Sequence, residues 1–227
     1  MCIRDSLMGC WKPEILNHPH FKIHLQGRLI PINKIEPELP SIDDYRPIVA
    51  LSPMAKFLEA RFALKLQAFV KDHCCSGQTG FLRGCGTFIN LHRIICWASR
   101  SKRRKSSIFF VNLRKAFDSV PAATLFSILR TRNVLSPQEI TFLQAWYSKI
   151  HVGISTGSKV VFVKPEKGVV QGSLLSPLLF NIFFDTLLRR LILAGFDPHS
   201  LFAYADDLAI SVPNLDQLHR AILIVER

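Results

Sequence analysis

The pattern of apolar and polar positions predicts a chain of alternating helices and short strands. Apolar residues at helical spacing predict a helix over residues 54–72, whose buried face is expected to carry Phe57, Leu58, Phe62, Leu66 and Phe69. A second helix is expected over about 87–99. Short apolar runs predict an edge strand at Arg28–Lys34, where Pro31 is tolerated, a buried strand at Ile108–Leu113, and strands at 150–155 and 159–163.

Turn and capping residues define the remaining elements. Ser136 followed by Pro137 and Glu139 is a typical helix start, because Glu139 can reach back to the cap amide. Another helix begins at Ser176-Pro177 and stops at Gly195. Leu201–Val212 suggests two strands joined by a tight turn at Ala205–Asp207, and Asn214 with Gln217 caps a last helix. Segregated strands and helices indicate an α+β fold rather than a parallel βαβ sheet.

Composition narrows the class of protein. The apolar fraction of 48% and mean hydropathy of +0.21 exclude intrinsic disorder, and the richest apolar stretch, Val169–Gly195, is too interrupted for a membrane span. The net charge of +12 favours a polyanionic partner such as nucleic acid, although acidic lipids or solubility alone would also fit it. The run Lys102–Lys105 is expected to be an exposed loop, with a nuclear-targeting or phosphate-binding patch as the alternative.

The six cysteines form no CxxC pair and no histidine pair has zinc-finger spacing, so a structural zinc site is not expected. Buried free thiols in a reducing, intracellular compartment are expected instead, in the nucleus or the cytoplasm. Residues 1–6 resemble the translation of a sequencing adaptor, which we expect to lie outside the fold. The chain also stops at Arg227 inside a predicted helix, so both ends of the chain look accidental.

Candidate chemistry lies at Asp206 and Asp207, two adjacent carboxylates between apolar arms. Two neighbouring like charges are costly to bury unless a cation neutralises them, and hard oxygen ligands suit Mg²⁺. The alternative is a solvated Asp-Asp turn in an ordinary hairpin.

Five motifs occur in an order and spacing that resemble the reverse transcriptases of non-LTR (LINE-type) retrotransposons. Tyr204–Asp207 (YADD) is similar to the metal-binding hairpin of that family. The other four are Asp44–Ile48 (DYRPI), Gly77–Phe81 (GQTGF), Asn112–Val120 (NLRKAFDSV) and Gly168–Phe180 (GVVQGSLLSPLLF). A group II intron-type enzyme is the alternative within the same fold. The residue sequences of the DYRPI and GVVQGSLLSPLLF motifs favour the LINE type.

The resemblance implies a right-hand polymerase fragment with a small antiparallel palm sheet packed on helices and no thumb. The expected division is an uncertain segment at 7–27, fingers at 28–104, and a palm at 105–227 with a helical fingers insertion at about 121–149. The implied partners are an RNA template, a DNA primer and dNTPs, while the endonuclease and thumb of the element polyprotein are expected elsewhere.

The resemblance also implies the site residues. Asp206 and Asp207 would hold two Mg²⁺ ions, or Mn²⁺, for nucleotidyl transfer. Arg46 would bind the triphosphate, Phe117 would lie beneath the sugar and exclude a 2′-hydroxyl, and Gln171 would lie near the incoming nucleotide.

Asn112 departs from the family pattern, which has aspartate at this metal-binding position. An amide is nearly isosteric with a carboxylate but neutral, and Asp118, six residues on, is a poor substitute even on one extended strand. We therefore expect severely reduced or absent polymerase activity. Val170, where the family usually has proline, is a smaller departure. Three alternatives to an impaired polymerase remain: a non-catalytic nucleic-acid-binding domain, a decayed element copy, and a sequencing error at position 112.

Overall fold

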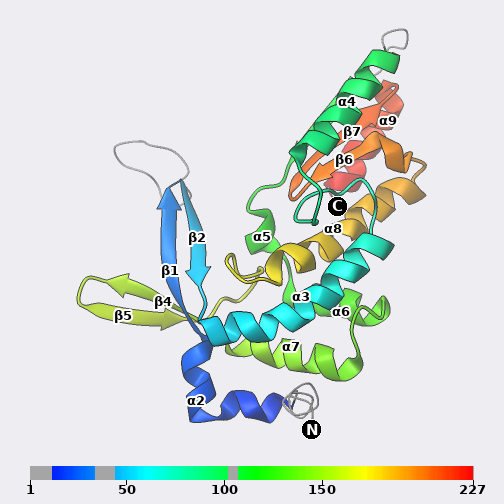
Figure 1. The fold of residues 1–227 in the computed structure, drawn as a ribbon. Coiled ribbons are helices and arrows are strands. Elements are labelled where there is room, and N and C mark those ends of the chain that lie inside the picture. Colours follow the sequence, from blue (N-terminus) through cyan, green and yellow to red (C-terminus); the bar gives the residue numbers. More distant parts are fainter. Residues whose placement is uncertain (1–11, 34–43, 102–106, 227) are drawn as a thin grey trace. The chain divides into compact units, whose positions relative to one another are not determined.

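The computed structural model describes residues 12–33, 44–101 and 107–226, whose helices and strands are drawn in Figure 1. The chain divides into two compact units, each built from two stretches of sequence. The first comprises Met1–Lys65 and Asp118–Ser176, and the second comprises Leu66–Phe117 and Pro177–Arg227. The adaptor-like residues 1–6 and the basic run at 102–105 lie outside the described residues, so the expectations about them stay predictions.

A four-stranded sheet belongs to the first unit and has the order β2-β1-β4-β5. Its strands are β1 (Gln26–Asn33), β2 (Tyr45–Ala50), β4 (His151–Thr156) and β5 (Lys159–Val163). The β1–β4 pair is parallel, whereas β1–β2 and β4–β5 are antiparallel. The expectation of an edge strand is therefore wrong for the start of β1. Pro31 pairs with Pro47 of β2 and lies beyond the short pairing with β4, so its missing N–H costs no ladder bond on that side.

Helices form the core of the first unit. They are η2 (Pro13–Asn17), α2 (Pro19–Lys22), η3 (Ile23–Leu25), α6 (Ala122–Thr131), α7 (Pro137–Lys149) and the first part of α3 (Pro53–His73). The predicted start of α7 is confirmed, since the Ser136 hydroxyl accepts the Glu139 N–H and the Glu139 carboxylate accepts the Ser136 N–H. Aromatic side chains fill the interior, where the rings of Phe62 and Phe142 stack with centroids 5.9 Å apart.

The predicted helix over 54–72 is confirmed as α3, but the buried face is shifted. The side chains that the structure buries along it are Ala55, Glu59, Phe62, Leu66 and Val70. Phe57 is 61% exposed, so its placement on the buried face is wrong. Residues two positions apart lie on opposite sides of a helix, and Phe57 is two positions from both Ala55 and Glu59.

The second unit holds a three-stranded antiparallel sheet with the order β3-β7-β6. Its strands are β3 (Ser107–Asn112), β6 (Leu201–Tyr204) and β7 (Asp207–Val212). The accompanying helices are α4 (Thr87–Ser101), α8 (Ser176–Leu193), η5 (Pro198–Ser200) and α9 (Leu215–Val225), while the short α5 (Ala116–Ser119) spans the boundary between the units. A small antiparallel sheet with helices confirms the predicted α+β fold.

One face of this sheet is packed and the other is partly open. The packed face carries Val111, Leu201, Ala203, Leu208, Ile210 and Val212. Phe110, which points to the opposite face of β3, is 72% exposed. The expectation of a fully buried strand at 108–113 is therefore wrong, because β3 is an outer strand covered on one face only.

Three further expectations concern the described residues. The last helix is capped as predicted, with the Asn214 side chain accepting the Gln217 N–H. Cys74, Cys75, Cys85 and Cys96 are free thiols as expected, but they are half-buried or exposed rather than buried. Among the described helices, none has the length and apolar character needed to cross a membrane.

Candidate active site

Asn112 and Asp207 face each other across neighbouring strands of the three-stranded sheet. They are direct partners in the antiparallel register of β3 and β7, so their side chains project from the same face. Directly opposed residues have Cβ atoms about 4.5–5.5 Å apart. Both side chains are exposed, and the half-buried Asp206 precedes Asp207 in the connecting turn. The structure thus brings position 112 together with Asp207, beside the turn that carries Asp206.

The turn that carries Asp206 is a two-residue connection between β6 and β7. Ala205, its first residue, has φ of +56°, a left-handed conformation that is uncommon for a residue with a Cβ. Tyr204 and Asp207 close the hairpin as register partners. The predicted hairpin is confirmed, although Asp207 already belongs to β7 rather than to the turn.

The donor set at this hairpin suits a hard cation but lacks one charge. Two carboxylates and the amide oxygen of Asn112 are oxygen ligands of the kind that Mg²⁺ accepts. Within the described part of the chain, no group of three or more His, Cys, Asp or Glu side chains is placed to hold a metal ion. An aspartate at position 112 would add a third carboxylate directly opposite Asp207.

Phe117 lies in an aromatic cluster of the second unit. Its ring stacks on Phe180 with centroids 4.4 Å apart and meets the edge of Phe81 at 6.0 Å. Phe81 belongs to the GQTGF motif and Phe180 to helix α8. These contacts fix the Phe117 ring, and its role beneath a nucleotide sugar stays a prediction.

Gln171 and Arg46 belong to the first unit. The Gln171 side chain donates to the Asp118 carboxylate at 3.0 Å, and its backbone carbonyl accepts the Val49 N–H at 2.7 Å. Gly172 has φ of +112°, and a Cβ there would lie 2.2 Å from the Val49 carbonyl oxygen, so this loop requires glycine. Arg46 is exposed on β2, the strand to which Val49 also belongs.

Asp118 occupies a different environment from the extended strand considered for it. The strand ends at Asn112, and Asp118 lies in the short helix α5, where it accepts the hydrogen bond from Gln171. The premise of an even strand offset from position 112 is therefore wrong. The expectation that Asp118 does not replace the missing aspartate stays a prediction.

Two polar residues that the sequence did not single out organise these loops. Glu59 of α3 is buried and accepts hydrogen bonds from the Ser173 hydroxyl at 2.8 Å and the Leu174 N–H at 2.9 Å. Gln78, inside the GQTGF motif, contacts the backbone of Ala205. The one sequence signal for Glu59 was its position at helical spacing from the apolar Phe62 and Leu66. Gln78 had no sequence signal other than its place in the GQTGF motif.

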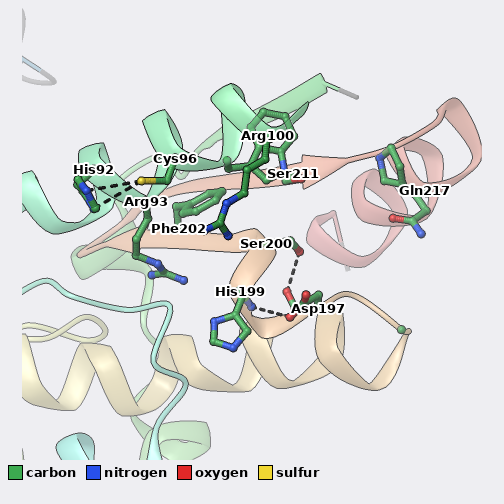
Figure 2. Close-up of a pocket in the computed structure, with 13 residues that line it drawn as sticks. His92, Arg93, Cys96, Arg100, Asp197, His199, Ser200, Phe202, Ser211 and Gln217 are labelled. Carbon is green, nitrogen blue, oxygen red and sulfur yellow. Dashed lines mark hydrogen bonds between the residues drawn. The ribbon is translucent and has the colours of Figure 1, made fainter. Parts of the chain in front are cut away.

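A separate hollow lies beside the sheet of the second unit, and Figure 2 shows the side chains that line it. Its volume is about 640 Å³. Its walls come from α4, η5, β6, β7 and the start of α9. Arg93 lies with its guanidinium 5.2 Å from the centre of the Phe202 ring and donates to the Leu201 carbonyl. None of the predicted site residues lines this hollow.

Comparison with known proteins identifies the family of this chain. A family profile described as "Reverse transcriptase (RNA-dependent DNA polymerase)" matches residues 32–227. The chain belongs to this family. Its sequence is 28% identical over 189 residues to a Pol polyprotein from the type-1 retrotransposable element R2 of Popillia japonica, covering 78% of this chain and 26% of that protein. It is also 28% identical over 178 residues to an RNA-directed DNA polymerase from mobile element jockey of Drosophila funebris, covering 74% and 19% respectively.

A solved structure supports the same fold. The apo telomerase from Candida tropicalis, truncated from its C-terminal domain, aligns with a TM-score of 0.65 at 13% identity over 99% of this chain and 51% of that chain. These matches confirm the resemblance to LINE-type reverse transcriptases and the reverse transcriptase fold. This reverse transcriptase fragment spans about a quarter of the R2 relative and about a fifth of the jockey relative.

Proposed function

We propose that this chain is part of the RNA-directed DNA polymerase domain of a LINE-type retroelement, built for two-metal nucleotidyl transfer and impaired by Asn112. The observation that carries the proposal is the pairing of Asn112 with Asp207 across β3 and β7, beside Asp206 in the turn. Membership of the reverse transcriptase family supports it. On this proposal residues 28–104 form the fingers and 105–227 the palm, inside an intracellular polyprotein acting in the nucleus or cytoplasm.

In this proposal Asp206 and Asp207 hold the divalent ions, with position 112 completing the ligand set. When bound, Mg²⁺ or Mn²⁺ lowers the barrier by activating the primer 3′-hydroxyl and stabilising charge on the leaving pyrophosphate. The amide of Asn112 supplies an oxygen but no negative charge, and its nitrogen end donates where a ligand must accept. The chain therefore keeps the scaffold of the site and loses much of its attraction for cations.

The remaining predicted residues would act on the substrates. Arg46 would bind the triphosphate of the incoming dNTP, since a guanidinium fork matches phosphate oxygens. Phe117, whose ring is fixed between Phe81 and Phe180, would restrict the sugar to one without a 2′-hydroxyl. Gln171, held through its carbonyl and its side-chain amide, would lie near the nucleotide. The RNA template and DNA primer would bind to a strongly basic chain.

Restoring the carboxylate tests the proposal. We expect Asn112→Asp to raise Mn²⁺ affinity by at least about tenfold, a change of the size that altered metal environments produce. Primer extension on an RNA template should rise by at least about a hundredfold, as electrostatic contributions to transition states allow. Without metal, the variant should be less stable by up to about 1 kcal/mol, because like charges then face each other across the strands. Asn133→Asp is the charge-matched control, because Asn133 is exposed between α6 and α7.

Two outcomes would contradict specific parts of the proposal. If Asn112→Asp gains no Mn²⁺ affinity, the metal site is assigned wrongly. If the unmodified chain extends primers within about tenfold of the variant, the impairment is wrong. Salt-dependent binding to RNA–DNA duplex, without extension by either protein and without a gain in Mn²⁺ affinity in Asn112→Asp, would instead identify a non-catalytic nucleic-acid-binding domain, the function that Asn112 itself favours.

A further inference from the structure

The GQTGF loop lies along the outer edge of the hairpin formed by β6 and β7. β6 is an edge strand of the three-stranded sheet, and the loop pairs with it at Ala203. The Ala203 N–H donates to the Gly77 carbonyl at 2.9 Å, and the Ala203 carbonyl accepts the Thr79 N–H at 2.9 Å. The loop therefore extends the sheet like one further short strand and satisfies the otherwise open edge.

From this position, the side chain of Gln78 holds the turn. Its Oε1 accepts the Ala205 N–H at 2.9 Å, and its Nε2 donates to the Ala205 carbonyl at 2.8 Å. The same Oε1 accepts the Gly80 N–H at 2.9 Å. Gln78 is only 3% exposed, so these bonds form away from solvent, where an unpaired amide would be costly. One amide thus binds both backbone groups of a single turn residue.

Ala205 is a residue whose conformation needs such support. Its φ of +56° lies in the left-handed region, which costs a non-glycine residue about 1–2 kcal/mol. Gly80 lets the loop approach closely, because a Cβ at this position would lie 2.3 Å from the Ala205 nitrogen. Two hydrogen bonds and close packing thus stabilise a strained residue immediately before Asp206.

We propose that Gln78 is a positioning residue for the metal site. By fixing the peptide groups on both sides of Ala205, it sets the direction in which Asp206 and Asp207 leave the turn. This inference rests on the proposed function, since the carboxylates it orients are the proposed ligands. Gln78 itself contacts the turn backbone through its amide, and it acts on the site through that backbone.

Asn90 of α4 offers a matched comparison. Its Nδ2 donates to the Ala203 carbonyl at 2.7 Å and to the Thr79 hydroxyl at 2.9 Å. It is a buried amide that holds the same strand and the same loop, but its bonds end two residues before Ala205. Gln78→Glu removes the donor to the Ala205 carbonyl in the turn. Asn90→Asp removes the donor to the Ala203 carbonyl in β6, so it is the matched change that leaves the hydrogen bonds of Ala205 in place.

The test compares Gln78→Glu with Asn90→Asp in the 227-residue chain carrying Asn112→Asp. We expect Gln78→Glu to weaken Mn²⁺ binding by at least about tenfold, the effect typical of lost supporting contacts around a metal. An added carboxylate would by itself attract a cation, so weaker binding reports geometry rather than charge. At lower pH the difference in Mn²⁺ affinity between Gln78→Glu and its parent should become smaller, because a protonated carboxyl group at position 78 can again donate to the Ala205 carbonyl. Asn90→Asp should leave Mn²⁺ affinity within about threefold of the parent.

Amide hydrogen exchange at Ala205 tests the hydrogen bond from its N–H to Gln78 separately from metal binding. Exchange is measured in Gln78→Met, which removes the acceptor for the Ala205 N–H; we expect it to accelerate at least about tenfold there and to stay unchanged in Asn90→Asp. Parent-like Mn²⁺ affinity in a folded Gln78→Glu protein would overturn the positioning role. If the Asn112→Asp parent binds no Mn²⁺, the proposed function fails at that step. Unchanged Ala205 exchange in Gln78→Met would independently overturn the role of Gln78 in holding the turn.

Discussion

At the scale of one residue, Glu59 is an ionisable group that holds a loop through hydrogen bonds although it is buried. Its carboxylate is 1% exposed on α3 and accepts hydrogen bonds from Ser173 and Leu174, which follow Gln171 in the same loop. Removal from water raises the pKa of Glu59, and the hydrogen bonds from Leu174 and Ser173 offset only part of that shift. The loop thus depends on a group that burial favours in its neutral form.

The raised pKa predicts how stability changes with pH. The folded protein holds this proton more tightly than the unfolded chain, so the free energy of unfolding should fall as pH rises from 4.5 through the raised pKa. Glu59→Gln keeps an acceptor for Leu174 and a group that can bond Ser173. We expect it to flatten this pH dependence and to stabilise the protein by about 1 kcal/mol at pH 8. Urea unfolding between pH 5 and 8 measures both effects.

Glu14→Gln is the control for that series, because Glu14 is exposed in η2 of the same unit. It should leave the slope of stability against pH unchanged. An unaltered slope in Glu59→Gln, or a loss of stability at every pH, would show that the carboxylate is held ionised.

At the scale of elements, the sequence predicted what is decided locally and missed what neighbours decide. The cap at Ser136 and the hairpin around Ala205 follow from a few adjacent residues, and both are confirmed. Phe57 and Phe110 were assigned to buried faces, yet apolar spacing cannot tell which face of a helix or outer strand receives a covering element. The parallel pairing of Gln26 with His151 and the contact of Gln78 with Ala205 join distant positions, for which the sequence offered no local signal.

The local signal at Ser136 supports a quantitative prediction for α7. Its hydroxyl accepts the Glu139 N–H, and the Glu139 carboxylate bonds back to Ser136. Ser136→Ala removes the acceptor for one end of the helix and should lower the free energy of unfolding by about 1 kcal/mol. Ser148→Ala on the exposed side of the same helix should change it by less than about 0.5 kcal/mol. Equal effects of the two substitutions in urea unfolding would show that the capping box contributes nothing specific.

At the scale of the molecule, the residues of the proposed function are divided between two units that each combine separate stretches of the chain. Asn112, Phe117, Asp206 and Asp207 belong to one unit, while Arg46 and Gln171 belong to the other. The sequence placed these residues through five ordered motifs rather than through geometry, and the structure supplies geometry within each unit. Family resemblance thus indicated the chemistry, whereas the hydrogen bonds that support the loops became visible only in the fold.

The charge of the whole molecule yields a prediction that separates binding from catalysis. With a net charge of +12, the chain should bind an RNA–DNA duplex largely by displacing counterions from phosphates. Its affinity, measured by fluorescence anisotropy, should then fall by at least about tenfold between 50 and 200 mM salt, with log affinity linear in log salt concentration. Asn112→Asp should reproduce the same slope, because on the proposed function position 112 holds metal rather than phosphate, and the substitution changes the net charge by only one unit. Affinity that ignores salt, or tighter binding to vesicles of acidic lipid than to the duplex, would contradict a nucleic-acid partner while leaving the metal site to be decided by its own titration.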